Sequence, residues 1–256
     1  MMKNFATGLL LCFQFFTAIP VKKQLPLTAK SVTAMYANMP FLGLLMGVTS
    51  ICIIQINEHF FHFSTLLLAI LLIITSIIIT GGLHVDGLID TGDAFFSYKD
   101  QQKRLDILDD PRVGAFGVLT IVCALLLKLG FFYEALTRDV HLFYFIAIPL
   151  LARLAMLFYF VTMKTAKTTG LAAYFKGLVN AKQILLICTL FLLVLLGVAI
   201  YFGQWNMFIL ALFMLVIIVL YRHWTKKNFG GMTGDLLGAL YEGTEIILWA
   251  MLLLFI

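Results

Sequence analysis

Long apolar runs alternate along the chain with short stretches that hold most of the charged residues. A helix needs about 20 mostly apolar residues to cross a bilayer. Runs of about this length lie near residues 32–57, 64–83, 113–133, 141–163, 184–202, 206–222 and 236–256. The pattern therefore predicts an all-α, polytopic membrane bundle of about seven spans, folded as a single domain over residues 1–256.

Residues 5–20 form a further apolar segment behind Lys3, which gives it some likeness to a secretory signal. Its phenylalanines and the absence of an A-x-A cleavage site argue against removal as a signal peptide. At roughly 16 residues the segment is short for a span. A re-entrant or interface-lying helix explains it at least as well as a transmembrane one.

The composition is that of a membrane protein. Hydrophobic residues make up 62% of the chain and charged residues 12%, against roughly 45–50% and about 25% in soluble domains. This excludes a soluble globule. The four cysteines all lie inside apolar runs without C-x-x-C spacing, so they suggest neither a disulfide framework nor a zinc site.

The net charge of +5 reflects topology rather than binding to nucleic acid. Most lysines and arginines lie in alternate loops, at 20–31, 84–112, 164–183 and 222–235. The loops between these hold only Arg138. By the positive-inside rule, the basic loops face the cytoplasm.

The loop predicted at 84–112 carries seven of the thirteen acidic residues. Asp86, Asp90 and Asp93 are spaced so that they project from one face of a helix. Three carboxylates on one face repel each other, and a divalent cation would relieve that repulsion. Oxygen ligands favour Mg²⁺, with Mn²⁺ as an alternative. A solvated acidic face is the competing interpretation.

Glycines and a histidine lie among these aspartates. Gly81, Gly82, Gly87 and Gly92 need an explanation, because glycine inside a helix costs up to about 1 kcal/mol relative to alanine. Close approach of the backbone to a ligand or a neighbouring helix would supply it. His84 could bind metal or contact substrate, or could be a structural hydrogen-bonding residue.

A second polar stretch, residues 103–117, alternates basic and acidic groups just before a span. Arg104 and Arg112 could pair with phosphate oxygens through their planar guanidinium groups. Asp109 or Asp110 could hold a second metal or act as a general base. The competing interpretation is an ion-paired loop at the membrane surface.

A third stretch, residues 230–242, is a glycine-rich turn that enters the last span. Free backbone N–H groups at a helix start suit a phosphate. Gly231, Thr233 and Asp235 are therefore candidate substrate-binding residues on the same face as the other carboxylates.

Charged residues also lie within the predicted spans. Glu242 and Glu245 fall in the last span, and such residues mark a site or a buried partner. Arg153 is a plausible partner for one of them and a further candidate substrate-binding residue. Gly43 and Gly47 have a G-x-x-x-G spacing that favours close helix packing.

Four segments together resemble the cobalamin synthase family, the adenosylcobinamide-GDP ribazoletransferases. They are FFTAIPV at 15–21, GGLHVDGLIDTGDAF at 81–95, RLDILDDPRVGAFGV at 104–118 and GGMTGDLLGALYEGTE at 230–245. The resemblance covers nearly the whole chain. The departures from the family pattern are small: Ala18, Gly92 and the stretch Asp109-Asp110-Pro111.

The resemblance implies a reaction and roles for residues. Adenosylcobinamide-GDP would react with α-ribazole, or its 5′-phosphate, to give adenosylcobalamin, or its phosphate, and GMP. Mg²⁺ would be held by Asp86, Asp90 and Asp93 and would bind the pyrophosphate. Asp93 or Asp110 would accept the proton of the ribazole hydroxyl, with His84 a further candidate catalytic residue. Arg104 and Arg112 would hold phosphate oxygens.

The resemblance also implies a location and partners. It places the protein in the bacterial inner membrane, with the active site on the cytoplasmic face. The substrates and the lipid bilayer are the expected partners, and self-association or contact with other enzymes of vitamin B12 synthesis is plausible.

Two competing functions remain open. A CDP-alcohol phosphotransferase of lipid synthesis would also place aspartates at helical spacing, but its Asp-Gly-x-x-Ala-Arg core is replaced here by Asp90 at the alanine and Thr91 at the arginine. A secondary transporter would require acids in mid-span and an inverted repeat. The acids are predicted mainly in loops, and no repeat is visible.

Overall fold

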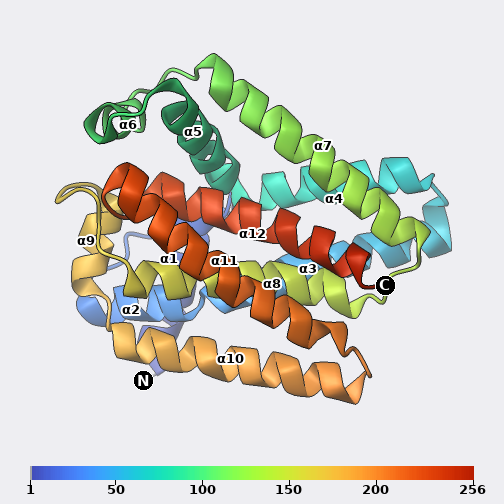
Figure 1. Ribbon diagram of the computed structural model, residues 1–256. Coiled ribbons are helices and arrows are strands. Elements are labelled where there is room, and N and C mark those ends of the chain that lie inside the picture. The colour runs from blue at the N-terminus through green and yellow to red at the C-terminus, as the bar shows by residue number, and fades with distance from the viewer. Residues whose placement is uncertain (1) are drawn as a thin grey trace.

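The computed structural model describes residues 2–256 of the protein, and it is built almost entirely of helices (Figure 1). In chain order these are α1 (Met2–Phe16), α2 (Ala29–Ala37), α3 (Met39–Ile56), the π-helical turn η1 (Asn57–Phe61), α4 (Thr65–Thr80), α5 (Leu83–Ser97), α6 (Gln101–Ile107), α7 (Ala115–Thr137), α8 (Phe143–Thr162), α9 (Leu171–Leu178), α10 (Ala181–Tyr201), α11 (Asn206–Phe229) and α12 (Gly234–Leu254). Within these residues no strand forms, so the predicted all-α class is confirmed.

Six helical segments within residues 2–256 are long and apolar enough to cross a membrane. They are the continuous segment Ala29–Phe61, which comprises α2, α3 and η1, and the helices α7, α8, α10, α11 and α12. These six agree with six of the seven predicted runs. The predicted polytopic membrane bundle is therefore confirmed.

The run at 64–83 differs from its prediction as a simple span. Helix α4 ends at Thr80, and α5 leaves it at an angle of 94°. Gly81 and Gly82 make this turn with φ angles of 63° and 75°, a left-handed conformation that glycine adopts without steric cost. The chain has seven spans only if the bent pair α4–α5 counts as one.

The predicted loop 84–112 therefore begins with a helix. Helix α5 carries all three aspartates of the first motif and packs against α7 and α12. The helix agrees with the predicted spacing of the three aspartates. Its place differs from the predicted loop, because α5 packs against two long helices, with Asp86 exposed, Asp90 partly buried and Asp93 buried.

Helix α8 lies at the centre of the bundle and is buried along nearly its whole length. It contacts α3, α10, α11 and α12. A Cβ atom on Gly43 of α3 would lie 2.8 Å from the Cα of Leu150, and one on Gly47 would overlap with Ile146. The predicted packing role of the G-x-x-x-G pair is thus confirmed.

The short helix α1 covers one side of this core. It packs against α2, where Gly8 lies directly against Ala34. Its apolar part, Asn4–Phe16, is shorter than a span. This agrees with the prediction that the N-terminal segment is short for a transmembrane span.

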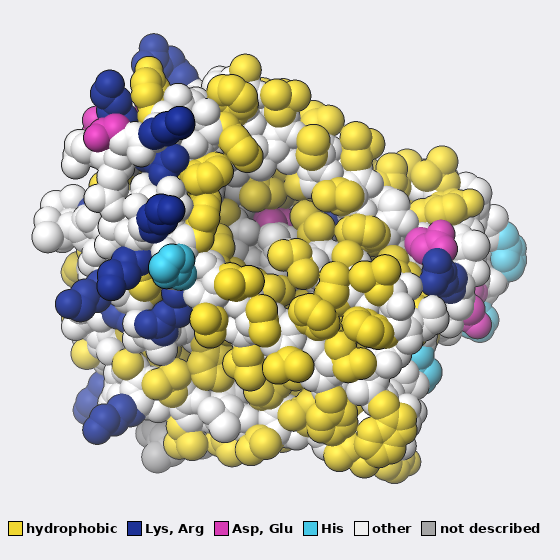
Figure 2. Space-filling view, viewed as in Figure 1, with side chains coloured by type: hydrophobic (Ala, Val, Ile, Leu, Met, Phe, Trp, Pro, Cys, Tyr) yellow, Lys and Arg dark blue, Asp and Glu magenta, His cyan; other side chains and the backbone are white. Residues whose placement is uncertain are grey.

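Charged side chains are distributed unevenly over the surface. Figure 2 shows lysine and arginine gathered at one end of the molecule, where α6 and α9 lie, and a largely apolar surface beside it. A membrane protein places such an apolar surface against lipid. The motifs at 81–95, 104–118 and 230–245 meet toward the basic end, where the candidate site is found.

Candidate active site

Two glycines bring helix α5 against helix α12. A Cβ atom on Gly87 would lie 2.7 Å from the backbone oxygen of Asp235, and one on Gly238 would lie 3.0 Å from that of His84. Only glycine permits backbones to approach this closely. The glycines of the first and third motifs therefore serve the contact between these helices.

This approach gathers carboxylates from both helices. The charges of Asp86, Asp235 and Asp93 all act on Asp90, with Asp86 the strongest. Asp86 is exposed, whereas Asp90 and Asp235 are partly buried. Like charges in a partly desolvated place repel each other strongly. A cation or a proton is needed to make this arrangement favourable.

A cavity of about 370 Å³ opens beside these carboxylates. Volumes of this size are typical of small-molecule sites. Its polar wall includes His84, Asp86, Asp109, Lys167, Thr233 and Asp235. Its apolar wall includes Phe15, Tyr36, Met39, Met156, Phe160 and Phe175. The cavity is thus suited to a ligand with one charged and one apolar part.

Residues 232–235 of the glycine-rich turn line the cavity, but several groups of the turn already have partners within the protein. Thr233 is the N-cap of α12 and accepts the N–H of Leu236 at 3.3 Å. Gly231 packs against the segment 164–166, because a Cβ atom there would lie 2.6 Å from the backbone oxygen of Lys164. Backbone hydrogen bonds in both directions join Met232 to this segment.

Sequence reasoning missed Lys167, which lies in the connection between α8 and α9. Its Nζ donates to Asp109 Oδ2 at 2.6 Å and to the backbone oxygen of Leu105 at 3.0 Å. This contact joins the connection to the stretch after α6, and both Lys167 and Asp109 line the cavity. The sequence indicates Lys167 only through the excess of lysines in the loop 164–183. The positive-inside rule accounts for that excess without any role in a site.

Asp93 is engaged at the contact between α5 and α7. Its side chain is only 8% exposed and accepts the N–H of Gly117, in α7, at 3.3 Å. In the part of the chain that the structure describes, no three His, Cys, Asp or Glu side chains are placed so that they could hold one metal ion. The three aspartates are therefore not brought to a single point.

Arg104 is buried, and its guanidinium is fully engaged within the protein. It donates to the backbone oxygen of Tyr98 at 2.6 Å and to Asn228 Oδ1 at 2.6 Å, and more weakly to the oxygens of Phe95 and Asn228. These bonds tie α6 to the end of α11. The predicted phosphate contact would require Arg104 to give up this role.

Arg112 and Asp110 pair with each other at the surface. Arg112 Nη2 lies 2.6 Å from Asp110 Oδ2, and the arginine side chain is 87% exposed. The hydrogen bonds from the side chain and the backbone of Arg112 lower the pKa of Asp110 to about 2. Neither residue lines the cavity. A carboxylate with so low a pKa is a weak proton acceptor.

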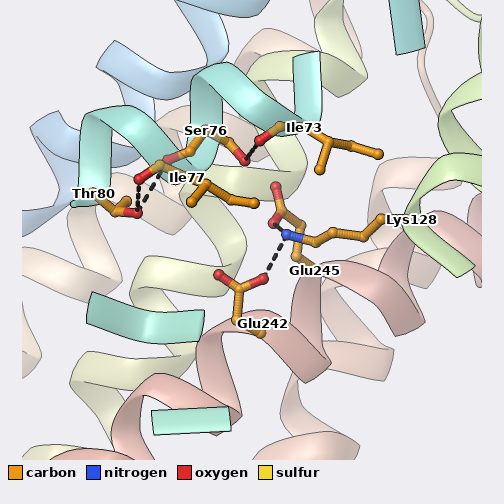
Figure 3. Close-up of polar contacts among 7 residues, drawn as sticks. All are labelled: Ile73, Ser76, Ile77, Thr80, Lys128, Glu242 and Glu245. Carbon is orange, nitrogen blue, oxygen red and sulfur yellow. Dashed lines mark hydrogen bonds and ion pairs between the residues drawn. The ribbon is translucent and has the colours of Figure 1, made fainter. Parts of the chain in front are cut away.

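The glutamates of the last span have a partner other than the predicted one. Lys128 of α7 lies 2.6 Å from both Glu242 and Glu245, and all three side chains are buried (Figure 3). The prediction that Arg153 pairs with one of these glutamates is wrong. Lys128 was overlooked because it is a single charge in a long apolar run.

Arg153 instead contacts His84. Its Nη1 donates to His84 Nε2, since a guanidinium has no acceptor, and its guanidinium carbon lies 4.2 Å from the ring centre of Tyr241. Arg153 Nε and Nη2 have no hydrogen-bond partner among the described residues.

Figure 2 shows a hollow in the apolar surface, with acidic and basic side chains at its base. The hollow lies over α4 and α12 in the view shared with Figure 1. Buried charges at this depth need partners, because lipid supplies none.

Comparison with known proteins identifies the family. The chain matches the sequence model of the cobalamin-5-phosphate synthases over residues 8–253. It is 40% identical to the adenosylcobinamide-GDP ribazoletransferase of Geobacillus sp. strain WCH70, covering 98% of this chain and 97% of that protein. The protein of the same name from Clostridioides difficile strain 630 is 30% identical, over 93% of each chain. No solved structure matches the chain at a significant level. The chain therefore belongs to the cobalamin-5-phosphate synthase family.

Proposed function

We propose that this protein is an adenosylcobinamide-GDP ribazoletransferase. It joins α-ribazole, or α-ribazole 5′-phosphate, to adenosylcobinamide-GDP in the membrane. A ribazole hydroxyl oxygen attacks the phosphorus attached to cobinamide, and the bond between this phosphorus and the bridging oxygen of the pyrophosphate breaks. GMP leaves, and the hydroxyl proton passes to a carboxylate. The products are adenosylcobalamin, or its 5′-phosphate, and GMP.

The likeness to the Geobacillus relatives carries this proposal. These transferases match the chain over nearly their full length, which includes every helix that forms the cavity. The cavity itself agrees with the chemistry of the substrates. Its carboxylate wall suits a pyrophosphate bridged by a cation, and its aromatic wall suits the large, partly apolar corrinoid or the benzimidazole base.

The carboxylates fit a Mg²⁺ ion that takes only part of its coordination from the protein. Mg²⁺ is often bound by one or two carboxylates and completes its shell with water and substrate phosphate. Two of the three carboxylates of Asp86, Asp90 and Asp235 would hold it. When bound, the ion would neutralise charge on the pyrophosphate and on the departing GMP. Mn²⁺ has similar ligand preferences.

The proton acceptor is Asp86 or Asp235; Asp109 also lines the cavity but is paired with Lys167. Of the two candidates from the sequence, Asp110 is weakened as a base by its pairing with Arg112, and Asp93 is turned toward α7. An acceptor must lie within hydrogen-bond reach of the hydroxyl that it deprotonates. The cavity wall meets this requirement better than either of those positions.

The active site opens to the cytoplasm in this proposal. The lysines and arginines gathered near the cavity are the residues that the positive-inside rule retains on the cytoplasmic side. Both substrates are large and charged, so they reach the site from an aqueous compartment.

The reaction is tested with purified protein in detergent, supplied with adenosylcobinamide-GDP and α-ribazole, by measuring GMP release. We expect GMP only when both substrates and Mg²⁺ are present, and no release after EDTA until Mg²⁺ is restored. GMP release without α-ribazole would indicate hydrolysis instead of transfer. Absence of turnover in protein of confirmed fold would refute the proposal.

A further inference from the structure

Helix α7 begins without a capping side chain of its own. Its N-cap residue is Gly114, and no side-chain cap hydrogen bond comes from that position. The first N–H groups of a helix have no partner within the helix. At this end α7 packs against α5, so water has limited access to the N–H of Gly117, which is buried.

Asp93 supplies the missing cap from the neighbouring helix. Its Oδ1 accepts the N–H of Gly117, which is the third residue of α7. An N-cap side chain normally accepts from the second or third residue of its helix, so Asp93 takes this place across the interface. A negative charge is also favourable at the positive end of the helix dipole.

The space that Asp93 occupies exists because residue 114 is glycine. A Cβ atom on Gly114 would overlap with both carboxylate oxygens of Asp93 and lie 2.5 Å from its Cγ. The same contact requires Gly92, whose Cβ would overlap with Thr120, and Gly117, whose Cβ would lie 2.9 Å from Ile89. Glycines of both helices therefore shape one close interface around this carboxylate.

We infer that Asp93 is a positioning residue: its carboxylate caps α7 and thereby fixes α5, so that Asp86 and Asp90 face Asp235. In this role Asp93 contacts neither the metal nor the substrate. The spacing of the three aspartates places them on one helix face, but two of them, Asp86 and Asp90, belong to the site, and Asp93 belongs to the interface between α5 and α7. The inference deepens the proposed function and relies on it only for measurements of activity.

A double-mutant cycle tests the contact without any substrate. Gly114→Ala and Asp93→Ala should each lower the melting temperature in detergent, by about 2–8 °C on the usual effect of a lost cap. The melting temperature of the double variant should fall by much less than the sum of the two single decreases, because the new methyl group of residue 114 then enters the space that the carboxylate has left. Strictly additive shifts would show that Asp93 does not lie against Gly114 and would overturn the inference.

Activity and metal response distinguish Asp93 from Asp86. Asp93→Asn keeps an oxygen that can accept the N–H of Gly117, so GMP release should stay within about threefold of the wild type. Mg²⁺ should raise the melting temperature of this variant by as much as it raises that of the wild type. Asp86→Asn should lose GMP release and the response to Mg²⁺ while keeping its melting temperature in EDTA. Asp139→Asn, at an exposed position outside the cavity, is the matched control.

The opposite result is equally clear. If Asp93→Asn folds normally but loses GMP release and the response to Mg²⁺ as completely as Asp86→Asn, Asp93 binds the metal or accepts the proton. If no form of the protein releases GMP, the proposed function fails, and the melting-temperature cycle still decides where the Asp93 side chain lies.

Discussion

At the scale of single residues, the buried contact between Arg153 and His84 gives the histidine a defined orientation. Because Arg153 only donates, His84 Nε2 must carry the lone pair, which leaves the ring proton on Nδ1. His84 lines the cavity. The histidine therefore lies in the cavity wall as a neutral ring held by Arg153.

Replacement of His84 tests this contact. His84→Gln keeps an oxygen that can accept from Arg153, whereas His84→Ala leaves the buried guanidinium without that acceptor. Loss of such a bond to a buried charged group costs about 1.5–3 kcal/mol. We expect the alanine variant to be the less stable in thermal unfolding in detergent, and equal stability of the two variants would argue against the contact.

The ion triad of Lys128, Glu242 and Glu245 supports a second prediction. Lys128→Met should destabilise the protein by about 3–5 kcal/mol, because it leaves two buried carboxylates without their cation. Arg112→Met is the control, since Arg112 pairs with Asp110 at an exposed position, where an ion pair contributes little to stability.

Thermal unfolding of the two methionine variants provides the comparison. Replacing Glu242 and Glu245 by glutamine in the Lys128→Met protein should recover much of the lost stability, because the two buried carboxylates that had lost their cation are then absent. A Lys128→Met protein as stable as its control would show that the triad is not buried as described.

Several side-chain roles could not be predicted from local sequence. Arg104 donates to Asn228, which lies 124 residues away in the sequence, and Lys128 donates to Glu242, which lies 114 residues away. The sequence shows only that these residues are charged and lie near or within membrane spans. Phosphate binding by Arg104 was consistent with this. The packing of α6 on the end of α11 gives the N–H groups of Arg104 partners within the protein, and local sequence does not predict this packing.

At the scale of helices, the glycines of α5 and α12 set how close the carboxylates come. Gly87→Ala should reduce GMP release by about a hundredfold, because its methyl group would meet the backbone of Asp235 and move the helices apart. Gly130→Ala in α7 is the matched control: nothing lies within 4 Å of its Cβ position.

The control variant should fold and turn over normally, with stability equal to or above the wild type, since alanine favours a helix over glycine by about 0.5–1 kcal/mol. Both are compared by GMP release and melting temperature. Wild-type activity in Gly87→Ala would mean that close approach of α5 to α12 is unnecessary.

The long apolar helices were predictable because length and hydropathy alone define a span. Their pairing was predictable only in part: the spacing of Gly43 and Gly47 indicated a close contact but not that α8 is the partner. The break after Thr80 was missed because residues 64–83 are apolar throughout, and the two left-handed glycines lie at the end of that run.

At the scale of the whole molecule, the basic end of the bundle carries the proposed active site. The proposed topology predicts that a cysteine at Lys103 is protected from a membrane-impermeant maleimide in intact cells, and that one at Glu58 is labelled. Both positions are exposed, Lys103 in α6 and Glu58 in η1, on opposite sides of the proposed membrane. The background protein has its four native cysteines replaced by alanine.

Permeabilised cells provide the control for this experiment, since both positions should then react. Labelling of Lys103→Cys in intact cells, with protection of Glu58→Cys, would reverse the orientation and place the cavity on the other side of the membrane.

In the proposed function, carboxylates of α5 and α12 bind Mg²⁺ and accept the proton during transfer of cobinamide phosphate to ribazole. The most direct measurement is GMP release by Asp86→Asn beside Asp139→Asn, both purified in detergent with melting temperatures equal to the wild type. We predict that Asp139→Asn matches the wild type and that Asp86→Asn releases no measurable GMP at any Mg²⁺ concentration. Substantial turnover by Asp86→Asn would contradict the claim.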